Sequence, residues 1–159
     1  MQDYWEYKID SMFNLGKSYD FFNNVSVFFP EKPKVNYLLY DQDTFLGYTV
    51  KKKEIEFTIW NLNEVYLDTL LLENWSVDFL FNQGLTNIII NYNSSFPNLF
   101  LDNHSEDSLT MKIFKDKLLI DKNNQLYYAR YSYPNNPLTD SIYLKMGNQY
   151  FNSIKIDSK

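Results

Sequence analysis

From residue 35 onward, apolar and polar residues alternate along much of the chain, and a period of two is typical of β-strands. Strands are predicted from Val35 to Tyr40 and from Phe45 to Val50, with the polar residues 41–44 between them as a hairpin connection. A third strand is predicted at 54–60, where apolar side chains share one face and polar side chains share the other. These three runs predict an antiparallel meander.

The C-terminal third carries further hairpin patterns, in which apolar residues alternate with charged or polar ones. Strands are expected over the runs 109–114, 117–120, 126–133, 142–145 and 150–156. The polar residues 121–124 supply one turn, and Met146-Gly147-Asn148 has the composition of another. The sequence therefore predicts that the chain ends in hairpins.

Three other segments are less regular. Residues 2–15 fit both a strand and a helix, and we favour a helix closed by Gly16. Residues 63–81 also fit both, and here the spacing favours one helix over 63–73 and a second from Ser76, as N-cap, to Gly84. The β-branched run at 86–92 predicts a buried strand.

The 159 residues suit one domain, spanning 1–159, that buries its own core. We expect an α+β fold with a mainly antiparallel, curved β-sheet of about seven to ten strands and one to three helices. The alternative is an all-β barrel of lipocalin-like size, although the Gly-x-Trp signature of lipocalins is missing around Trp5. No motif in the chain is specific enough to assign a family.

Charge and composition limit the class of partner. The net charge is −5, with 20 acidic residues against 15 basic ones, and the only basic cluster, Lys51-Lys52-Lys53, is followed directly by Glu54 and Glu56. Nucleic acid is therefore not an expected partner, because phosphate binding depends on basic patches. No apolar run is long enough to cross a bilayer and no signal peptide is visible, so we expect a cytoplasmic protein without a membrane partner.

Few residues offer catalytic chemistry. Cysteine is absent, and the single histidine, His104, lies in a polar segment that we interpret as a loop. Glu54 and Glu56 share a strand face at a spacing near that of a glycosidase carboxylate pair, but a solvated ladder with Lys52 is the simpler interpretation. We predict no catalytic residue, no metal ligand and no cofactor.

The strand at 126–133 is the most suggestive segment. Its alternation puts Tyr127, Tyr131 and Tyr133 on one face and Tyr128 and Arg130 on the other. Tyr and Arg often dominate binding interfaces, yet aromatic residues on a strand more often form core, and the pattern leaves both interpretations open. As partner-binding residues we predict Tyr128 and Arg130, together with three carboxylates of a supposed acidic loop: Asp102, Glu106 and Asp107.

The leading functional hypothesis is a non-enzymatic protein-binding module. An inhibitor, antitoxin or immunity-type protein that neutralises a basic enzyme or toxin by covering its surface would suit a small acidic domain rich in aromatic residues. The alternative is a carrier whose curved sheet encloses a small molecule. A third hypothesis is a hydrolase that uses His104 or an acidic pair.

Overall fold

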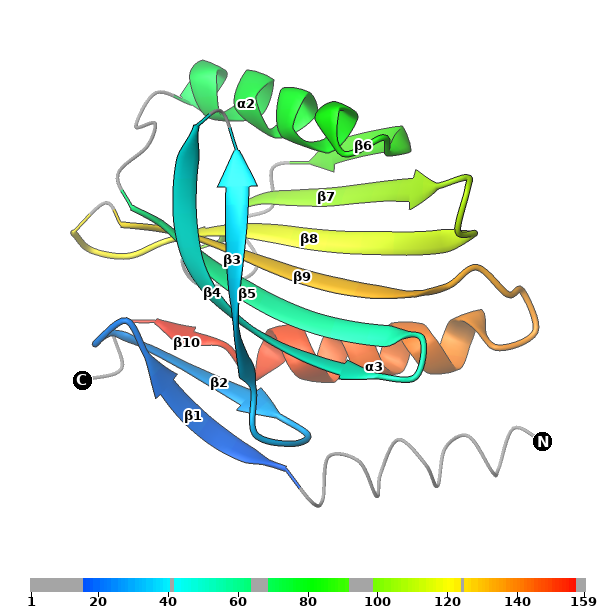
Figure 1. Ribbon diagram of the computed structural model, residues 1–159, viewed down its shortest axis with the longest axis horizontal. Helices are drawn as coiled ribbons and strands as arrows, with labels where there is room; N and C mark the ends of the chain where they lie inside the picture. The colour runs from blue at the N-terminus through cyan, green and yellow to red at the C-terminus, as the bar shows by residue number, and fades with distance from the viewer. Residues whose placement is uncertain (1–15, 41, 64–68, 92–98, 124, 157–159) are drawn as a thin grey trace.

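The computed structural model describes residues 16–40, 42–63, 69–91, 99–123 and 125–156, so the helix predicted for residues 2–15 lies outside the described part. That part contains ten strands and two helices (Figure 1). The strands are β1 (Lys17–Phe21), β2 (Val25–Phe29), β3 (Lys34–Tyr40), β4 (Asp43–Lys52), β5 (Ile55–Asn63), β6 (Thr86–Asn91), β7 (Leu99–Asp107), β8 (Lys112–Ile120), β9 (Leu126–Pro134) and β10 (Lys155–Ile156). The helices are α2 (Thr69–Asn82) and α3 (Asp140–Asn152).

The strands form two antiparallel sheets. The larger has seven strands in the order β3-β4-β5-β9-β8-β7-β6, and the smaller has three in the order β1-β2-β10. Figure 1 shows strong curvature in the larger sheet, since β3 and β4 run across the direction of β7, β8 and β9. This confirms the predicted α+β fold with a curved antiparallel sheet. The barrel alternative is wrong, because the described sheet stays open with β3 and β6 at its edges.

Two apolar cores lie on opposite faces of the large sheet (Figure 1). One core joins the sheet to α3 and to the small sheet, through side chains such as Phe57, Tyr131 and Tyr150. The other joins the sheet to α2, through side chains such as Trp60 and Phe79. A curved sheet covered on both faces explains why the apolar residues of the chain are so numerous.

Strand β9 lies in the middle of the large sheet and supplies both cores. Tyr127, Tyr131 and Tyr133 face α3, and Tyr128 faces α2, as the alternation predicts. Each residue from Leu126 to Tyr133 is buried. In the described structure this strand is therefore core, which answers the question that the sequence left open.

The predicted C-terminal hairpin is wrong, because residues 140–152 form helix α3. Ile142, Tyr143, Met146 and Tyr150 are buried at helical spacing. Gly147 lies inside the helix, where a Cβ atom would approach Cδ2 of Tyr131 to 2.6 Å. This glycine therefore permits close packing of helix on sheet, and the turn predicted around it does not form.

The middle of the chain also differs from the prediction. Helix α2 runs without a break across the boundary predicted between two helices, and Ser76 is buried within it and does not cap a second helix. Residues 64–68 of the first predicted helix lie outside the described part. The strand predicted at 86–92 exists as β6, but it is a mostly exposed edge strand, since only β7 pairs with it in the described sheet. The runs at 109–114 and 117–120 merge into the single strand β8, and residues 109–111 belong to the preceding turn.

The supposed acidic loop is wrong as well, because residues 99–107 form strand β7. Two of its acidic residues lie opposite lysines of β8: Asp102 lies opposite Lys117, and Asp107 lies opposite Lys112. Opposite charges on neighbouring strands stabilise such a polar strand. Within the described residues, neither helix has the length and apolar character that a membrane crossing requires.

Candidate functional site

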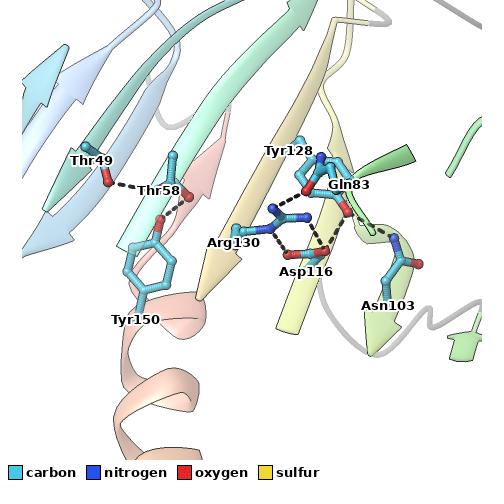
Figure 2. A network of polar contacts seen from close by, with 8 residues as sticks. All are labelled: Thr49, Thr58, Gln83, Asn103, Asp116, Tyr128, Arg130 and Tyr150. Carbon is cyan, nitrogen blue, oxygen red and sulfur yellow. Dashed lines mark hydrogen bonds and ion pairs between the residues drawn. The ribbon is translucent and has the colours of Figure 1, made fainter. Parts of the chain in front are cut away.

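A buried ion pair lies on the α2 face of the large sheet. Arg130 of β9 and Asp116 of β8 are direct cross-strand neighbours. The Arg130 Nε donates to Asp116 Oδ1 at 2.8 Å and Nη2 donates to Oδ2 at 3.1 Å, a bidentate arrangement (Figure 2). Asp116 is fully buried and Arg130 is 8 % exposed. Charges so far from water require this kind of pairing.

Three more residues complete the polar network around this pair (Figure 2). Gln83, just beyond the end of α2, accepts a hydrogen bond from Nη1 of Arg130 at 2.6 Å. Tyr128 donates to Asp116 Oδ2 at 2.7 Å and accepts from the Asn103 amide at 3.3 Å. Burial and the neighbouring Asp116 carboxylate raise the pKa of Tyr128 well above its usual value. The phenol therefore acts as a neutral hydrogen-bond donor.

Aromatic rings surround the guanidinium. The Arg130 Cζ atom lies 4.8 Å from the ring centroid of Phe114 and 5.7 Å from those of Trp60 and Phe79. Contacts at this range are favourable because the faces of the rings are electronegative. Burial lowers the pKa of Arg130, but Asp116 and Tyr128 together outweigh burial and raise the pKa above its usual value. The chain's single arginine is therefore a fixed positive charge held inside an aromatic cage.

A cavity of about 360 Å³ opens beside this network. Strand β3, the end of α2 and the centre of the sheet line it, with the residues Leu38, Leu39, Tyr40, Glu56, Trp60, Phe79, Asn82, Gln83, Phe114, Arg130 and Ser132. A second hollow of about 410 Å³ shares Leu39, Tyr40 and Asn82 with the first. The Tyr40 hydroxyl donates to Asp78 of α2 beside these hollows. Together they form a groove between β3 and α2, which we call the β3–α2 groove.

Glu56 contributes a negative charge to the cavity, and the exposed Lys51 of β4 is its direct cross-strand neighbour. Its half-buried carboxylate accepts only a 3.4 Å hydrogen bond from Thr49, and no basic side chain lies within ion-pair distance among the described residues. Lys52 pairs with Glu31 at 3.3 Å, and Glu54 is exposed in the turn before β5. The solvated ladder of Lys52, Glu54 and Glu56 is therefore wrong for Glu56. Arg130 and Asp116 neutralise each other, so Glu56 is the charged residue of the cavity lining that forms no ion pair among the described residues.

Strand β3 forms one wall of the groove and one edge of the large sheet. Val35, Tyr37 and Leu39 alternate along it and are 55 %, 62 % and 77 % exposed. Leu38 and Tyr40, at the alternate positions of the strand, pack against the α2 core. The edge therefore presents backbone groups for pairing beside a row of exposed apolar side chains.

The five predicted partner-binding residues do not form one surface. Tyr128 and Arg130 belong to the buried network on the α2 face, and Tyr128 has no exposed area. Asp102 and Glu106 lie on the α3 face, where Asp102 pairs with Lys117 at 3.4 Å and Glu106 accepts from Asn87 at 2.6 Å. Asp107 ends β7 and accepts hydrogen bonds from the turn that follows. Their role in binding a partner stays a prediction.

His104 lies on the α3 face, away from the Arg130 network. Its Nε2 is 3.8 Å from Glu106 Oε1, and its cross-strand neighbour is Lys115. Partial burial and the charge of Lys115 lower the pKa of His104, against the opposing effect of Glu106. Among the described residues, no group of three His, Asp or Glu side chains is placed to hold a metal ion.

Sequence reasoning missed the residues that surround Arg130. Asp116, Gln83 and Phe114 are brought to Arg130 by register and by the end of α2, neither of which the pattern of the chain predicts. One signal was present in the sequence. A lone arginine inside an aromatic strand needs an acidic partner, and on the neighbouring strand β8 Asp116 lies between Phe114 and Leu118 on the face that packs in the α2 core.

Comparison with known proteins leaves the function to these geometric arguments. No model of a protein family matches the sequence, and a search of curated proteins finds no relative.

Proposed function

We propose that this protein is a non-enzymatic binding module that holds an extended, basic segment of a partner protein along the β3–α2 groove. In this proposal it acts as an inhibitor or immunity-type protein in the cytoplasm, covering the active surface of a basic enzyme or toxin. The observation that carries the proposal is the Glu56 carboxylate, which forms no ion pair among the described residues, in a cavity beside β3, an edge strand of the described sheet.

The edge of β3 supports the mode of binding. An extended segment that adds to a free strand gains backbone hydrogen bonds, and its alternate side chains reach pockets beside the edge. Exposed Tyr37 and Leu39 offer apolar contact along the same edge. Leu39 also lines the cavity, so a segment paired with β3 would pass directly over its mouth.

Charge supports the basic character of the partner. A lysine or arginine side chain in the cavity would pair with Glu56 and lie near the aromatic rings that line it, both of which attract cations. The net charge of −5 adds a longer-range attraction for a basic partner, and this kind of complementarity accelerates encounter. The buried network beneath would keep the cavity walls in place.

Affinity capture from the source organism tests the proposal with four versions of the protein: wild type, Glu56→Gln, Leu39→Lys and Glu54→Gln. Wild type and Glu54→Gln should retain the same basic protein, because Glu54 lies in the exposed turn. Glu56→Gln removes the cavity charge, and Leu39→Lys places a like charge on the edge. Each should weaken the purified partner's binding about tenfold or more.

The variants make the outcome decisive. Glu56 and Leu39 are not core residues, so both variants are expected to fold. Heteronuclear NMR spectra of the purified variants would check that each one is folded. A partner retained equally by Glu56→Gln and wild type, or a retained partner that is acidic, would contradict the proposal.

The cavity volume favours a second candidate, a small-molecule carrier. About 360 Å³ lies within the range of roughly 300–1,000 Å³ typical of small-ligand pockets, and the walls combine aromatic rings with a few polar groups. Native mass spectrometry of protein purified from its source would show a retained ligand that Trp60→Ala loses. A spectrum with the bare protein mass alone would count against this candidate.

A further inference from the structure

The face of β3 that points away from α2 carries exposed apolar side chains. Val35, Tyr37 and Leu39 lie on this face, and each is more than half exposed. Leu46 of β4 lies directly opposite Tyr37 in the register, and it is exposed as well. Apolar side chains gathered on neighbouring strands are typical of an interaction surface. We call these four residues the outer row.

The other face of β3 has a different character. Asn36, Leu38 and Tyr40 are half-buried, and the last two pack against the α2 core. Successive side chains of a strand point to opposite faces, so a segment that pairs with the β3 edge would present its own side chains alternately to the two sides. One set would continue the outer row, and the other set would enter the β3–α2 groove.

A second carboxylate lies on the groove side. Asp78 of α2 is the charged residue in the lining of the hollow of about 410 Å³. Its Oδ2 accepts hydrogen bonds from the Tyr40 hydroxyl and from the Asn82 amide, the latter at 3.3 Å. Among the described residues, Asp78 forms no ion pair. The two hydrogen bonds therefore hold the carboxylate in place without neutralising its charge.

The groove thus offers two separate positions for a basic side chain. Glu56 lines the larger hollow, where Lys51 is its cross-strand neighbour, and Asp78 lines the second hollow, which has no basic residue in its lining. The two hollows share three lining residues, so they are continuous. A carboxylate without an ion pair is complementary to a lysine or arginine side chain.

We propose that the segment bound in the β3–α2 groove is a two-sided β-strand, with basic side chains facing Glu56 and Asp78 and apolar side chains continuing the outer row. This inference rests on the proposed function and specifies the partner more closely. The basic residues of the partner segment stand an even number of positions apart, and apolar residues occupy the positions between them. Asp78 is then a further residue that determines specificity.

Three blocked, fluorescently labelled peptides test this by anisotropy titration. In the first, lysine alternates with valine. The second has the same composition, but its lysines are grouped at one end and its valines at the other. The third is the alternating peptide with serine in place of valine. The first should bind about tenfold or more tightly than either of the others, because it alone matches charge on one side and apolar surface on the other.

Variants of the protein separate the two sides of the strand. Tyr37→Thr should weaken the alternating lysine–valine peptide about fivefold and leave the serine peptide unaffected, because the serine peptide has no apolar side. Asp78→Asn should weaken both alternating peptides about threefold, as loss of an exposed ion pair does. The matched controls are Leu138→Thr and Glu54→Gln, at exposed positions in turns away from β3, and both should bind like wild type.

The outcomes distinguish this inference from the function on which it rests. Equal affinity for the alternating and the grouped peptide, with binding still weakened by Glu56→Gln, would overturn the two-sided strand and leave the basic groove in place. If no lysine peptide binds and a single arginine derivative also fails to bind, the proposed function is wrong, and the inference falls with it.

Discussion

Arg130 and Asp116 are joined by two hydrogen bonds, of 2.8 and 3.1 Å, between the central strands of the large sheet. The pair lies on the α2 face, where its charges have almost no contact with water. Arg130 of this pair also lines the cavity between β3 and α2.

Removing one member of this pair should be strongly destabilising. Asp116→Asn or Arg130→Met leaves a buried charge without its partner, which typically costs on the order of 3–5 kcal/mol of unfolding free energy. The double variant Arg130→Met/Asp116→Leu should be less destabilised than either single one, because no charge is stranded. Urea denaturation of the three proteins measures this.

An exposed ion pair supplies the control. Glu31→Gln breaks the contact with Lys52, and both side chains are largely exposed, so the cost should be below about 1 kcal/mol. If Arg130→Met lowers the free energy of unfolding by no more than Glu31→Gln does, the buried guanidinium does not stabilise the core, and the role given to the network is wrong.

Gly147 should not tolerate a methyl group. Alanine is normally about 1 kcal/mol better than glycine inside a helix. Here, however, its Cβ would meet Tyr131 atoms at 2.6 and 2.8 Å. Gly147→Ala should therefore lower the free energy of unfolding by about 1–3 kcal/mol, as overpacked sites do. Ser141→Ala, at an exposed position of α3, should stay within about 0.5 kcal/mol of wild type. A stabilised Gly147→Ala would show that α3 packs elsewhere.

Buried tyrosines should make the protein sensitive to alkali. Burial raises the pKa of Tyr128, Tyr131 and Tyr150 above the usual value of about 10. Below pH 10 these phenols are neutral in both the folded and the unfolded chain, so ionisation takes nothing from the free energy of unfolding. Above pH 10 the unfolded chain releases these protons more readily than the folded one, and stability falls. A pH titration should show the tyrosinate absorbance of the buried phenols rising in the same transition in which the circular dichroism signal of the fold is lost. Ionisation of every tyrosine before that loss would contradict the burial of these three side chains.

The strands with clear alternation were predictable, and residues that serve tertiary contacts were not. The meander of β3 to β5 and the two faces of β9 follow from a period of two. Helix α3 was missed because Gly147 has the composition of a turn, whereas its function is to approach Tyr131. Strand β7 was missed because its charged residues pair with lysines of β8, which only the register reveals.

The candidate site was less predictable than the fold. The alternation correctly placed Tyr128 and Arg130 on one face, but it gave no information on the helix that covers that face. Glu56 resembled any polar residue on a wet strand face, and only the assembled fold places it in the lining of a cavity. Curvature and helix placement depend on distant contacts, so local pattern does not determine them.

The most direct test of the β3–α2 groove uses a defined basic probe, N-acetyl-arginine amide, and the indole N–H signal of Trp60, which lines the cavity. We predict a saturable shift of this signal in wild type and in Glu54→Gln, and its loss in Glu56→Gln. The neutral probe N-acetyl-glutamine amide should cause no shift. If the Trp60 signal does not shift when the arginine probe is added, or shifts equally in wild type and Glu56→Gln, the groove does not bind a basic side chain through Glu56.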